Sequence, residues 1–370
     1  MRVLITGGAG FVGSHLADEL LERGHDVRVL DDLIEQVHED RQWPAYLHKD
    51  AERVRGDVRD PAVVRRALLG VEAVYHFAAR VGVGQSMYQI AEYTSANGLG
   101  TAALLAEVIE RPVARFVVAS SMSLYGEGLY VDDCGDAVAD AARSPEQLRS
   151  SRWDPVDGDG RPLHPVPTPE TKPPQLASVY ALSKFDQERL ALLVGAAYNI
   201  PTVALRFFNI YGTRQALSNP YTGVLAIFAS RLLNGRAPLL FEDGQQRRDF
   251  VSVHDIVRAS CLALDRPAAL VAGQAFNVGS GESHTVVDVA QLLARTLGVN
   301  VEPEITGRSR VGDIRHCFAD LTRARTGLGY APQVRLEDGL RELATWLASQ
   351  QADDRAQVAH RELERRGLTA

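Results

Sequence analysis

Cysteine is scarce in this sequence of 370 residues. The three cysteines, Cys134, Cys261 and Cys317, lie far apart and form neither a disulfide framework nor a C-x-x-C spacing. Disulfides are rare in reducing compartments, so the cysteine content fits a cytoplasmic protein. We also expect no metal site.

A long apolar run and an excess of basic residues are missing as well. No stretch of about 18 apolar residues exists, so no membrane span is expected, and the N-terminal apolar run is too short for a signal peptide. The formal net charge of −7 argues against nucleic acid or an anionic membrane as the main partner. A small anionic substrate remains possible, because arginines can be concentrated locally.

The N-terminus carries a pattern typical of dinucleotide binding. Val3–Thr6 is a short apolar run that leads into the glycine-rich turn Gly7–Gly13, a helical pattern follows, and Val27–Leu30 predicts a second strand that ends in Asp31. The glycines allow the backbone to approach a pyrophosphate, and the helix N-terminus presents free N–H groups to it. Asp31 can accept hydrogen bonds from the adenosine ribose and would repel a 2′-phosphate. We therefore expect NAD rather than NADP as the cofactor.

Strands and helices continue to alternate along the chain. Strands are predicted over 53–57, 74–79 and 115–121, and a helix over 97–110. This order predicts an α/β fold with a doubly wound parallel sheet, the Rossmann arrangement, which binds ligands at the carboxyl ends of its strands. Ser121 stands at such an end.

We predict three parts of the chain. Residues 1–202 form an NAD-binding Rossmann domain, with an insertion at 132–176 that we expect to be an ordered lid or substrate-side flap. Residues 203–349 form mostly a smaller C-terminal α/β domain for the substrate, with segments near 203–208 and 250–278 returning to the Rossmann sheet. Residues 350–370 are polar and charged, which predicts an exposed helix or disorder.

The segment Ser178–Lys184 contains a Tyr-x-x-x-Lys pair. On a helix, Tyr180 and Lys184 lie one turn apart on the same face. A free tyrosine has a pKa of about 10, and a nearby ammonium lowers it, so the pair is a candidate general base. Alone, the pair is more typical of an ordinary amphipathic helix; the dinucleotide pattern gives it weight.

With these pieces in place, the chain resembles the extended short-chain dehydrogenase/reductase family of NAD-dependent nucleotide-sugar epimerases and dehydratases. The shared motifs occur in order and extend to about Trp346: the glycine turn, Gly56-Asp57-Val58, His76–Ala79, Asn97–Thr101, Ser120-Ser121, Tyr180-x-x-x-Lys184, Arg206–Asn209, Arg248–Phe250 and Arg310–Arg315.

The resemblance implies roles for individual residues. Tyr180 is implied as the catalytic base, Lys184 as a ligand of the nicotinamide ribose, and Ser121 as a hydrogen-bonding partner of the sugar oxygen. The implied cofactor site comprises Gly7, Gly10, Phe11, Val12, Gly13, Asp31, Asp57, Val58, Ala78, Ala79, Asn97, Tyr180 and Lys184. The implied substrate contacts are Ser123, Asn209, Val224, Arg248 and Arg310, whose arginines suit a diphosphate.

The reaction depends on the residues that follow Ser121. Family members that remove water resemble a pattern with Asp and Glu there, and uronate decarboxylases carry Glu at the second position. This chain has Met122 and Ser123, which cannot shuttle such a proton well. A 4-epimerase needs no added acid, so 4-epimerisation is favoured.

The substrate is predicted from three segments. Residues 121–130, 165–171 and 215–223 resemble the dTDP-L-rhamnose 4-epimerase branch, which makes dTDP-6-deoxy-L-talose. A 4-epimerase of UDP-glucose or UDP-glucuronate is the next alternative, and UDP-glucuronate decarboxylase follows. A non-enzymatic NAD-sensing protein is disfavoured, because such proteins usually lose the Tyr or the Lys.

A homodimer is also expected. The predicted helices at 97–110 and 177–198 are rich in Ala and Leu on more than one face, with Leu182, Leu190, Leu192 and Leu193 in the second. A helix that is apolar beyond one stripe must bury the remainder. The resemblance implies that two such helices pair across a two-fold axis in a four-helix bundle.

Overall fold

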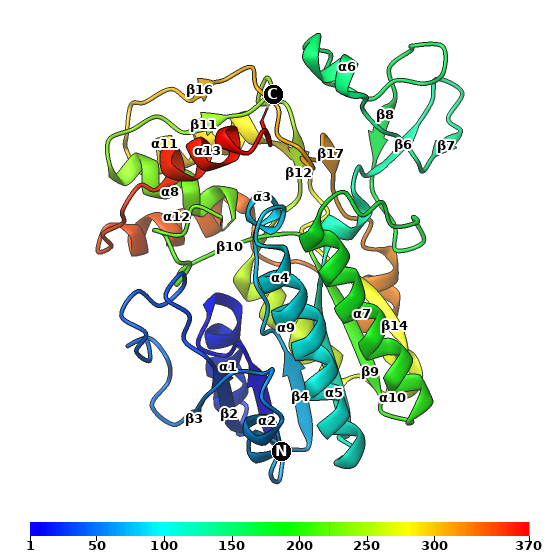
Figure 1. Ribbon diagram of the computed structural model, residues 1–370, viewed down its shortest axis with the longest axis vertical. Coiled ribbons are helices and arrows are strands. Elements are labelled where there is room, and N and C mark those ends of the chain that lie inside the picture. The colour runs from blue at the N-terminus through cyan, green and yellow to red at the C-terminus, as the bar shows by residue number, and fades with distance from the viewer. Residues whose placement is uncertain (222, 370) are drawn as a thin grey trace.

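A seven-stranded parallel sheet forms the centre of the computed structural model, which describes residues 1–221 and 223–369 (Figure 1). The strand order is β14-β9-β5-β4-β1-β2-β3, and every neighbouring pair is parallel. The strands are β1 (Arg2–Thr6), β2 (Asp26–Asp31), β3 (Glu52–Arg55), β4 (Ala73–His76), β5 (Arg115–Ser121), β9 (Thr202–Phe207) and β14 (Gln274–Val278). The predicted doubly wound Rossmann sheet is confirmed.

Helices cover both faces of this sheet, because alternate residues of its strands are buried on opposite sides. Val3 and Ile5 of β1 pack in a core with α1 (Phe11–Glu22) and α9 (Val253–Asp265). Leu4, between them, belongs to a second core with helices of the other face. These are α2 (Pro61–Ala67), α5 (Gly100–Glu110) and α7 (Val179–Ala197). Figure 1 shows α5 and α7 side by side in front of the sheet.

The strand order changes direction between β1 and β4. The chain runs outward from β1 through β2 to β3, then returns to the other side of β1 at β4. Such a switch leaves a crevice at the carboxyl ends of the two strands, where this class of fold binds its ligands. Short helices α3 (Val83–Ser86) and α4 (Ile90–Tyr93) and a π-helical stretch, Thr94–Leu99, follow β4 and lead into α5.

A smaller lobe with its own core lies above these strand ends in Figure 1. Its main helices are α8 (Val224–Leu233), α11 (Val286–Thr296) and α12 (Leu336–Leu347). Its short strands are β11 (Leu239–Leu240) with β16 (Glu304–Ile305), and β12 (Arg247–Arg248) between β15 (His284–Thr285) and β17 (His316–Cys317). Two shorter elements, the helix α10 (Ala268–Val271) and the π-helical turn Ala324–Leu328, pack near β14 of the large sheet.

The segment 250–278 was expected to return to the large sheet, and only part of it does. β14 joins the sheet beside β9. β13 (Phe250–Ser252) instead pairs with β10 (Asn209–Tyr211) in a separate two-stranded sheet. These two strands follow β9 and precede α9, so they connect the large sheet with the smaller lobe.

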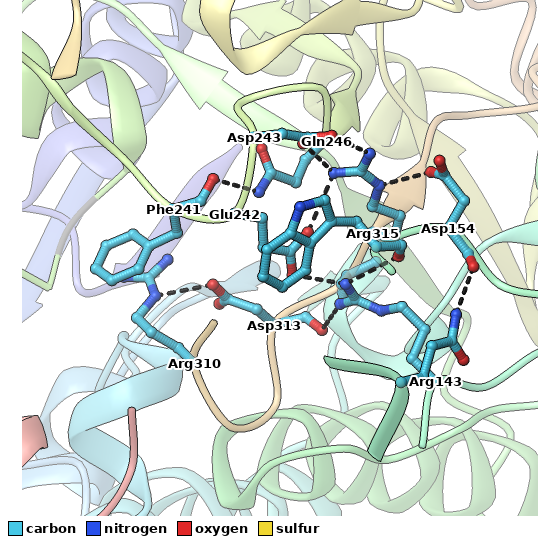
Figure 2. A network of polar contacts seen from close by, with 12 residues as sticks. Arg143, Asp154, Phe241, Glu242, Asp243, Gln246, Arg310, Asp313 and Arg315 are labelled. Carbon is cyan, nitrogen blue, oxygen red and sulfur yellow. Dashed lines mark hydrogen bonds and ion pairs between the residues drawn. The ribbon is translucent and has the colours of Figure 1, made fainter. Parts of the chain in front are cut away.

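The insertion at 132–176 is ordered and protrudes beside the smaller lobe, at the upper right of Figure 1. Its strands β7 (Ala137–Val138) and β8 (His164–Val166) flank β6 (Leu129–Val131), and α6 (Pro145–Arg149) lies between them in sequence. Arg143 of the insertion contacts Glu242 of the smaller lobe at 2.6 Å, and Arg315 contacts Asp154 at 2.7 Å (Figure 2). These ion pairs fasten the insertion to the lobe.

The tail was expected to be an exposed helix or disordered, and that expectation is wrong in part. α13 (Ala356–Arg365) is a helix, but Ala359 and Leu363 are buried at 6% and 5% exposure. Val358, on its other side, is 59% exposed. The tail therefore packs on the protein with one apolar face.

Candidate active site

A cavity of about 640 Å³ opens at the carboxyl ends of β1, β2, β4 and β5 and extends under the smaller lobe. Its walls include every predicted cofactor and substrate residue except Asn97. Among the described residues, none from the insertion 132–176 lines it. The insertion therefore does not form the substrate-side lid that we expected. Its ion pairs hold it against the smaller lobe, and Arg143 donates to the backbone oxygen of the cavity residue Asp313 at 2.9 Å.

The glycine-rich turn forms the floor of this cavity. Gly7 has a φ of +69°, which favours glycine, and a Cβ there would lie 2.8 Å from the Ala78 nitrogen. A Cβ at Gly10 would meet only the Gly7 oxygen, at 3.4 Å, so this backbone faces open space. A side chain at Gly7 would thus disrupt the turn, and one at Gly10 would extend into the space that a pyrophosphate needs.

Asp31 ends β2 beside this turn. Its carboxylate accepts hydrogen bonds from the backbone N–H groups of Ala9 and Leu33, both at 3.0 Å. These bonds hold it at the cavity wall, where a carboxylate has lone pairs left for ribose hydroxyls. Asp57, at the next strand end, pairs with Arg59 at 2.6 Å. The glycine turn and Asp31 together fit the pyrophosphate and ribose of a dinucleotide.

Asn97 lies beside the cavity, next to the lining residue Ala96, and is not itself among the lining residues. The side chain is fully buried in the π-helical stretch. Its amide nitrogen donates to the Ser183 hydroxyl at 2.8 Å, and its oxygen accepts from the Arg80 backbone at 2.7 Å. Asn97 thus joins α7 to the loop after β4.

Tyr180 and Lys184 lie on the first turns of α7, and both line the cavity. The Ser178 hydroxyl caps this helix by accepting from the Ala181 N–H, and Ser86 accepts from the Tyr180 N–H at 3.0 Å. Burial raises the pKa of Tyr180, and a hydrogen bond with Ser121 partly offsets this. The expected lowering of the Tyr180 pKa by Lys184 is not found among the protein's own groups.

Lys184 is held by its neighbours on α7. Its ammonium donates to the Gln187 side-chain oxygen at 2.7 Å. Burial lowers the pKa of Lys184 to about 7, against the opposing charge of Glu188. The Gln187 amide nitrogen donates in turn to Thr101 at 2.9 Å, so the lysine is tied into a buried polar network under the cavity.

Ser121 and Ser123 form a pair at the end of β5. The Ser123 hydroxyl donates to the Ser121 oxygen at 2.9 Å, and the Ser123 N–H donates to the same oxygen at 3.1 Å. Because Ser121 accepts both bonds, its own hydroxyl proton is left to donate to Tyr180 or to a ligand oxygen in the cavity. Ser123 therefore orients Ser121.

The opposite wall carries basic and amide groups. The Asn209 side-chain oxygen is buried without a hydrogen-bond partner in the described chain, which fits a contact to a ligand. Arg248 donates to the backbone oxygen of Arg315 at 2.9 Å. Arg310 lies 4.1 Å from the centre of the Phe241 ring and donates to Asp313 at 2.8 Å (Figure 2). Two guanidinium groups on one wall suit a diphosphate.

Several lining residues escaped the sequence analysis. They include Arg80, Met87, Tyr221, Arg231, Phe241 and five residues of the tail, Ala356, Ala359, His360, Leu363 and Leu368. Phe241 follows β11 and could have been found as an aromatic residue close before the Arg248 motif. The tail residues carry only a weak signal, which is the helical spacing of Ala356, Ala359 and Leu363.

Comparison with known proteins identifies the family. The family described as "NAD dependent epimerase/dehydratase family" matches residues 3–279. The chain belongs to this family. It is therefore an enzyme that uses NAD.

The chain of this family member is also similar to individual proteins over most of its length. It is 35% identical to dTDP-L-rhamnose 4-epimerase of Burkholderia thailandensis, covering 94% of this chain and 95% of the relative. Its structure is similar to UDP-glucose 4-epimerase of Thermotoga maritima with UDP-glucose, with 30% identity, a TM-score of 0.76, and coverage of 94% and 99%. UDP-glucuronic acid 4-epimerase of Bacillus cereus, in complex with UDP-glucuronic acid and NAD, matches at 25% identity and a TM-score of 0.75, with coverage of 94% and 99%.

Two further observations concern partners of this family member. None of the helices in the described residues combines the length and the apolar character that a bilayer crossing requires. The part of the chain that the structure describes also contains no group of three or more His, Cys, Asp or Glu side chains placed to hold a metal ion.

Proposed function

We propose that the protein catalyses NAD-dependent 4-epimerisation of a nucleotide-activated deoxyhexose, converting dTDP-L-rhamnose to dTDP-6-deoxy-L-talose. One observation carries the reaction type. Tyr180 and Ser121 meet at the cavity, while the two positions after Ser121 hold Met122 and Ser123 in place of carboxylates. The substrate is inferred from the relative that is 35% identical over nearly the whole chain.

The chain's own residues supply the acid–base chemistry. Tyr180 accepts the proton of the sugar C4 hydroxyl as the C4–H bond breaks, and returns it when the C4 ketone is reduced on its other face. Ser121 donates a hydrogen bond to the same oxygen and stabilises the developing carbonyl. When bound, NAD supplies the hydride acceptor and a positive charge near the tyrosine. Lys184 holds the ribose side of the site.

The opposite wall is proposed to hold the rest of the substrate. Arg248 and Arg310 bind the diphosphate, and the unpartnered oxygen of Asn209 accepts a hydrogen bond from the substrate. Val224 and Ser123 line the same cavity. Arg310 must leave Asp313, or share it, to reach a phosphate. Asp313 thus holds the Arg310 guanidinium beside the site when no phosphate is bound.

The alternatives differ in substrate and product. UDP-glucose or UDP-glucuronate 4-epimerisation requires the same Tyr180 chemistry, and decarboxylation would require a uronate. Incubation with a panel of dTDP- and UDP-sugars, followed by NMR of the products, separates them. We expect the talo product from dTDP-L-rhamnose. Turnover of UDP-glucose or UDP-glucuronate alone would reassign the substrate, and no turnover of any sugar would favour an NAD-sensing protein.

A tightly held NAD is expected in the purified protein. An epimerase returns its hydride, so the cofactor is not consumed, and Asp31 is positioned for an unphosphorylated ribose. Denaturing the protein and analysing the supernatant should give NAD(H). Recovery of NADP(H) instead would refute the assignment of Asp31.

We propose a homodimer that forms through α7 and the stretch that precedes α5. Leu182 and Leu193 of α7 are 53% and 57% exposed, and Leu99 is 58% exposed. Leu182 and Leu193 are eleven residues apart, which is close to three helical turns, so they lie on one face. A second copy of this chain would cover them, as a four-helix bundle.

Sedimentation at micromolar concentration tests this dimer. The wild type should sediment as a dimer and Leu193→Arg as a monomer, since a charge at the centre of an apolar interface is costly. Leu270→Arg, at an equally exposed leucine on α10, should leave the dimer intact. A monomeric wild type would contradict the proposal. The three cysteines are free, and we propose a cytoplasmic location on that basis.

A further inference from the structure

The C-terminal segment, residues 352–369, is held by contacts along its whole length. At its start, the Asp354 carboxylate is 2% exposed and pairs with Arg236 at 2.9 Å and Arg231 at 3.3 Å. The backbone beside it is also bound, because Asn234 donates to the Ala352 oxygen at 2.8 Å and Asp353 donates to Ser218 at 3.1 Å. The buried Asp354 carboxylate and its two arginine partners therefore anchor the start of the segment to α8 and to the turn after it.

The other end of the segment reaches the helices that follow β4, across the cavity from the smaller lobe. Arg366 lies 4.2 Å from the centre of the Tyr88 ring, and a Cβ on Gly84 would be 3.2 Å from Leu363. The Val311 N–H donates to the Leu368 oxygen at 3.0 Å. Tyr88 and Gly84 belong to the region after β4, whereas Val311 belongs to the smaller lobe. The segment therefore bridges the two sides of the cavity.

Between these ends, one face of α13 lines the cavity. Ala356, Ala359 and Leu363 have the spacing of one helical face, and His360 lies 5.5 Å from Phe241, ring centre to ring centre. Phe241 is the ring on which Arg310 lies. α13 thus extends from Phe241 to Gly84 along the part of the cavity that Arg248 and Arg310 also line.

We propose that residues 352–369 form a wall of the substrate site, which closes over the nucleoside diphosphate and takes no part in NAD binding. This inference rests on the proposed nucleotide-sugar substrate. The apolar face of α13 excludes water from the diphosphate, and charge pairs with Arg248 and Arg310 are stronger where water is excluded. In the part of the chain that the structure describes, no hydrogen bond or ion pair joins this segment to the glycine turn or to Asp31, and Arg355 reaches Glu39 in the loop after β2 at 3.8 Å. NAD retention is therefore the internal control.

Point variants of α13 test the wall with dTDP and UDP as probes. Leu363→Asp places a charge on the buried face, and we expect it to weaken binding of whichever probe the wild type binds by about tenfold or more. Val358→Asp places the same charge on the exposed face of the same helix and should change binding by less than about twofold. Asp354→Asn, which loosens the other end, should give an intermediate loss. NAD content should be unchanged in all three.

Hydrogen exchange in the wild type keeps the test independent of any variant. The amides of residues 356–368 should exchange more slowly when dTDP or UDP is bound, because the ligand stabilises the closed wall. This measurement decides the matter if Leu363→Asp loses NAD or fails to fold. Equal affinities of Leu363→Asp and Val358→Asp, or unchanged exchange with the nucleotide bound, would overturn the inference. A wild type that binds neither nucleotide would refute the proposed function instead.

Discussion

Tyr180→Phe is expected to lower turnover by roughly 10²–10⁴, the range typical of lost acid–base catalysis. The substitution removes the hydroxyl that accepts the C4 proton and keeps the ring that lines the cavity. NAD should remain bound, because the glycine turn and Asp31 are untouched. The measurement is the rate with the best substrate of the sugar panel, together with the NAD content of each preparation.

Tyr198→Phe is the matched control for this variant. Tyr198 caps the other end of α7 and is 52% exposed, so its hydroxyl should not affect turnover. A Tyr180→Phe enzyme that retains wild-type turnover would remove Tyr180 from the chemistry. Loss of NAD together with turnover would instead indicate a role in holding the cofactor site.

Glu188→Ala is expected to destabilise the folded protein by about 3–5 kcal/mol, the range for breaking a buried ion pair from one side. Glu188 is 1% exposed and accepts from Arg206 at 2.6 Å and from the Ser120 hydroxyl at 2.6 Å. Removing it leaves the buried Arg206 guanidinium, between β9 and α7, without its carboxylate partner, although the guanidinium still donates to Tyr125 at 2.8 Å. Urea unfolding followed by circular dichroism should give a clearly lower midpoint.

Asp338→Ala is the control for the ion pair. Asp338 pairs with Arg335 and Arg341 on the exposed start of α12, where water screens the charges, so its loss should barely move the midpoint. Equal midpoints for the two variants would show that the Glu188 cluster contributes no more than a surface pair.

The sequence predicts most of the large sheet, because its signals are local. A short apolar strand that ends in glycine, followed by a helix and a strand ending in Asp31, can be read within about thirty residues. Ser121 follows from the rule that parallel strands place their carboxyl ends at one edge, whereas Tyr180 follows from its helical spacing to Lys184. The family resemblance added the opposite wall, Asn209, Arg248 and Arg310.

Other features depend on contacts that no local pattern contains. Asn97 was assigned to the cofactor site, but its partners Arg80 and Ser183 draw it into the interior. The insertion was expected over the substrate, but Arg143 and Asp154 fasten it elsewhere through Glu242 and Arg315 (Figure 2). In both cases the deciding partners are distant in sequence.

The tail and Lys184 illustrate two further limits. The polar residues of 350–370 outnumber the few apolar ones, so the composition indicates exposure. The contacts of Arg366 with Tyr88 and of Asp354 with Arg231 hold α13 so that its apolar face lies toward the cavity. The sequence pattern contains neither contact. For Lys184, burial lowers the pKa to about 7. This burial depends on the packing of β5 and the π-helical stretch Thr94–Leu99 against α7.

The most direct test is conversion of dTDP-L-rhamnose by the wild type in D₂O, with NMR and mass spectrometry of the product. Direct return of the hydride predicts dTDP-6-deoxy-L-talose without deuterium at C4 or C5. Deuterium at C5, or accumulation of a stable 4-keto sugar in place of the talo product, would contradict epimerisation through Tyr180 and Ser121 alone.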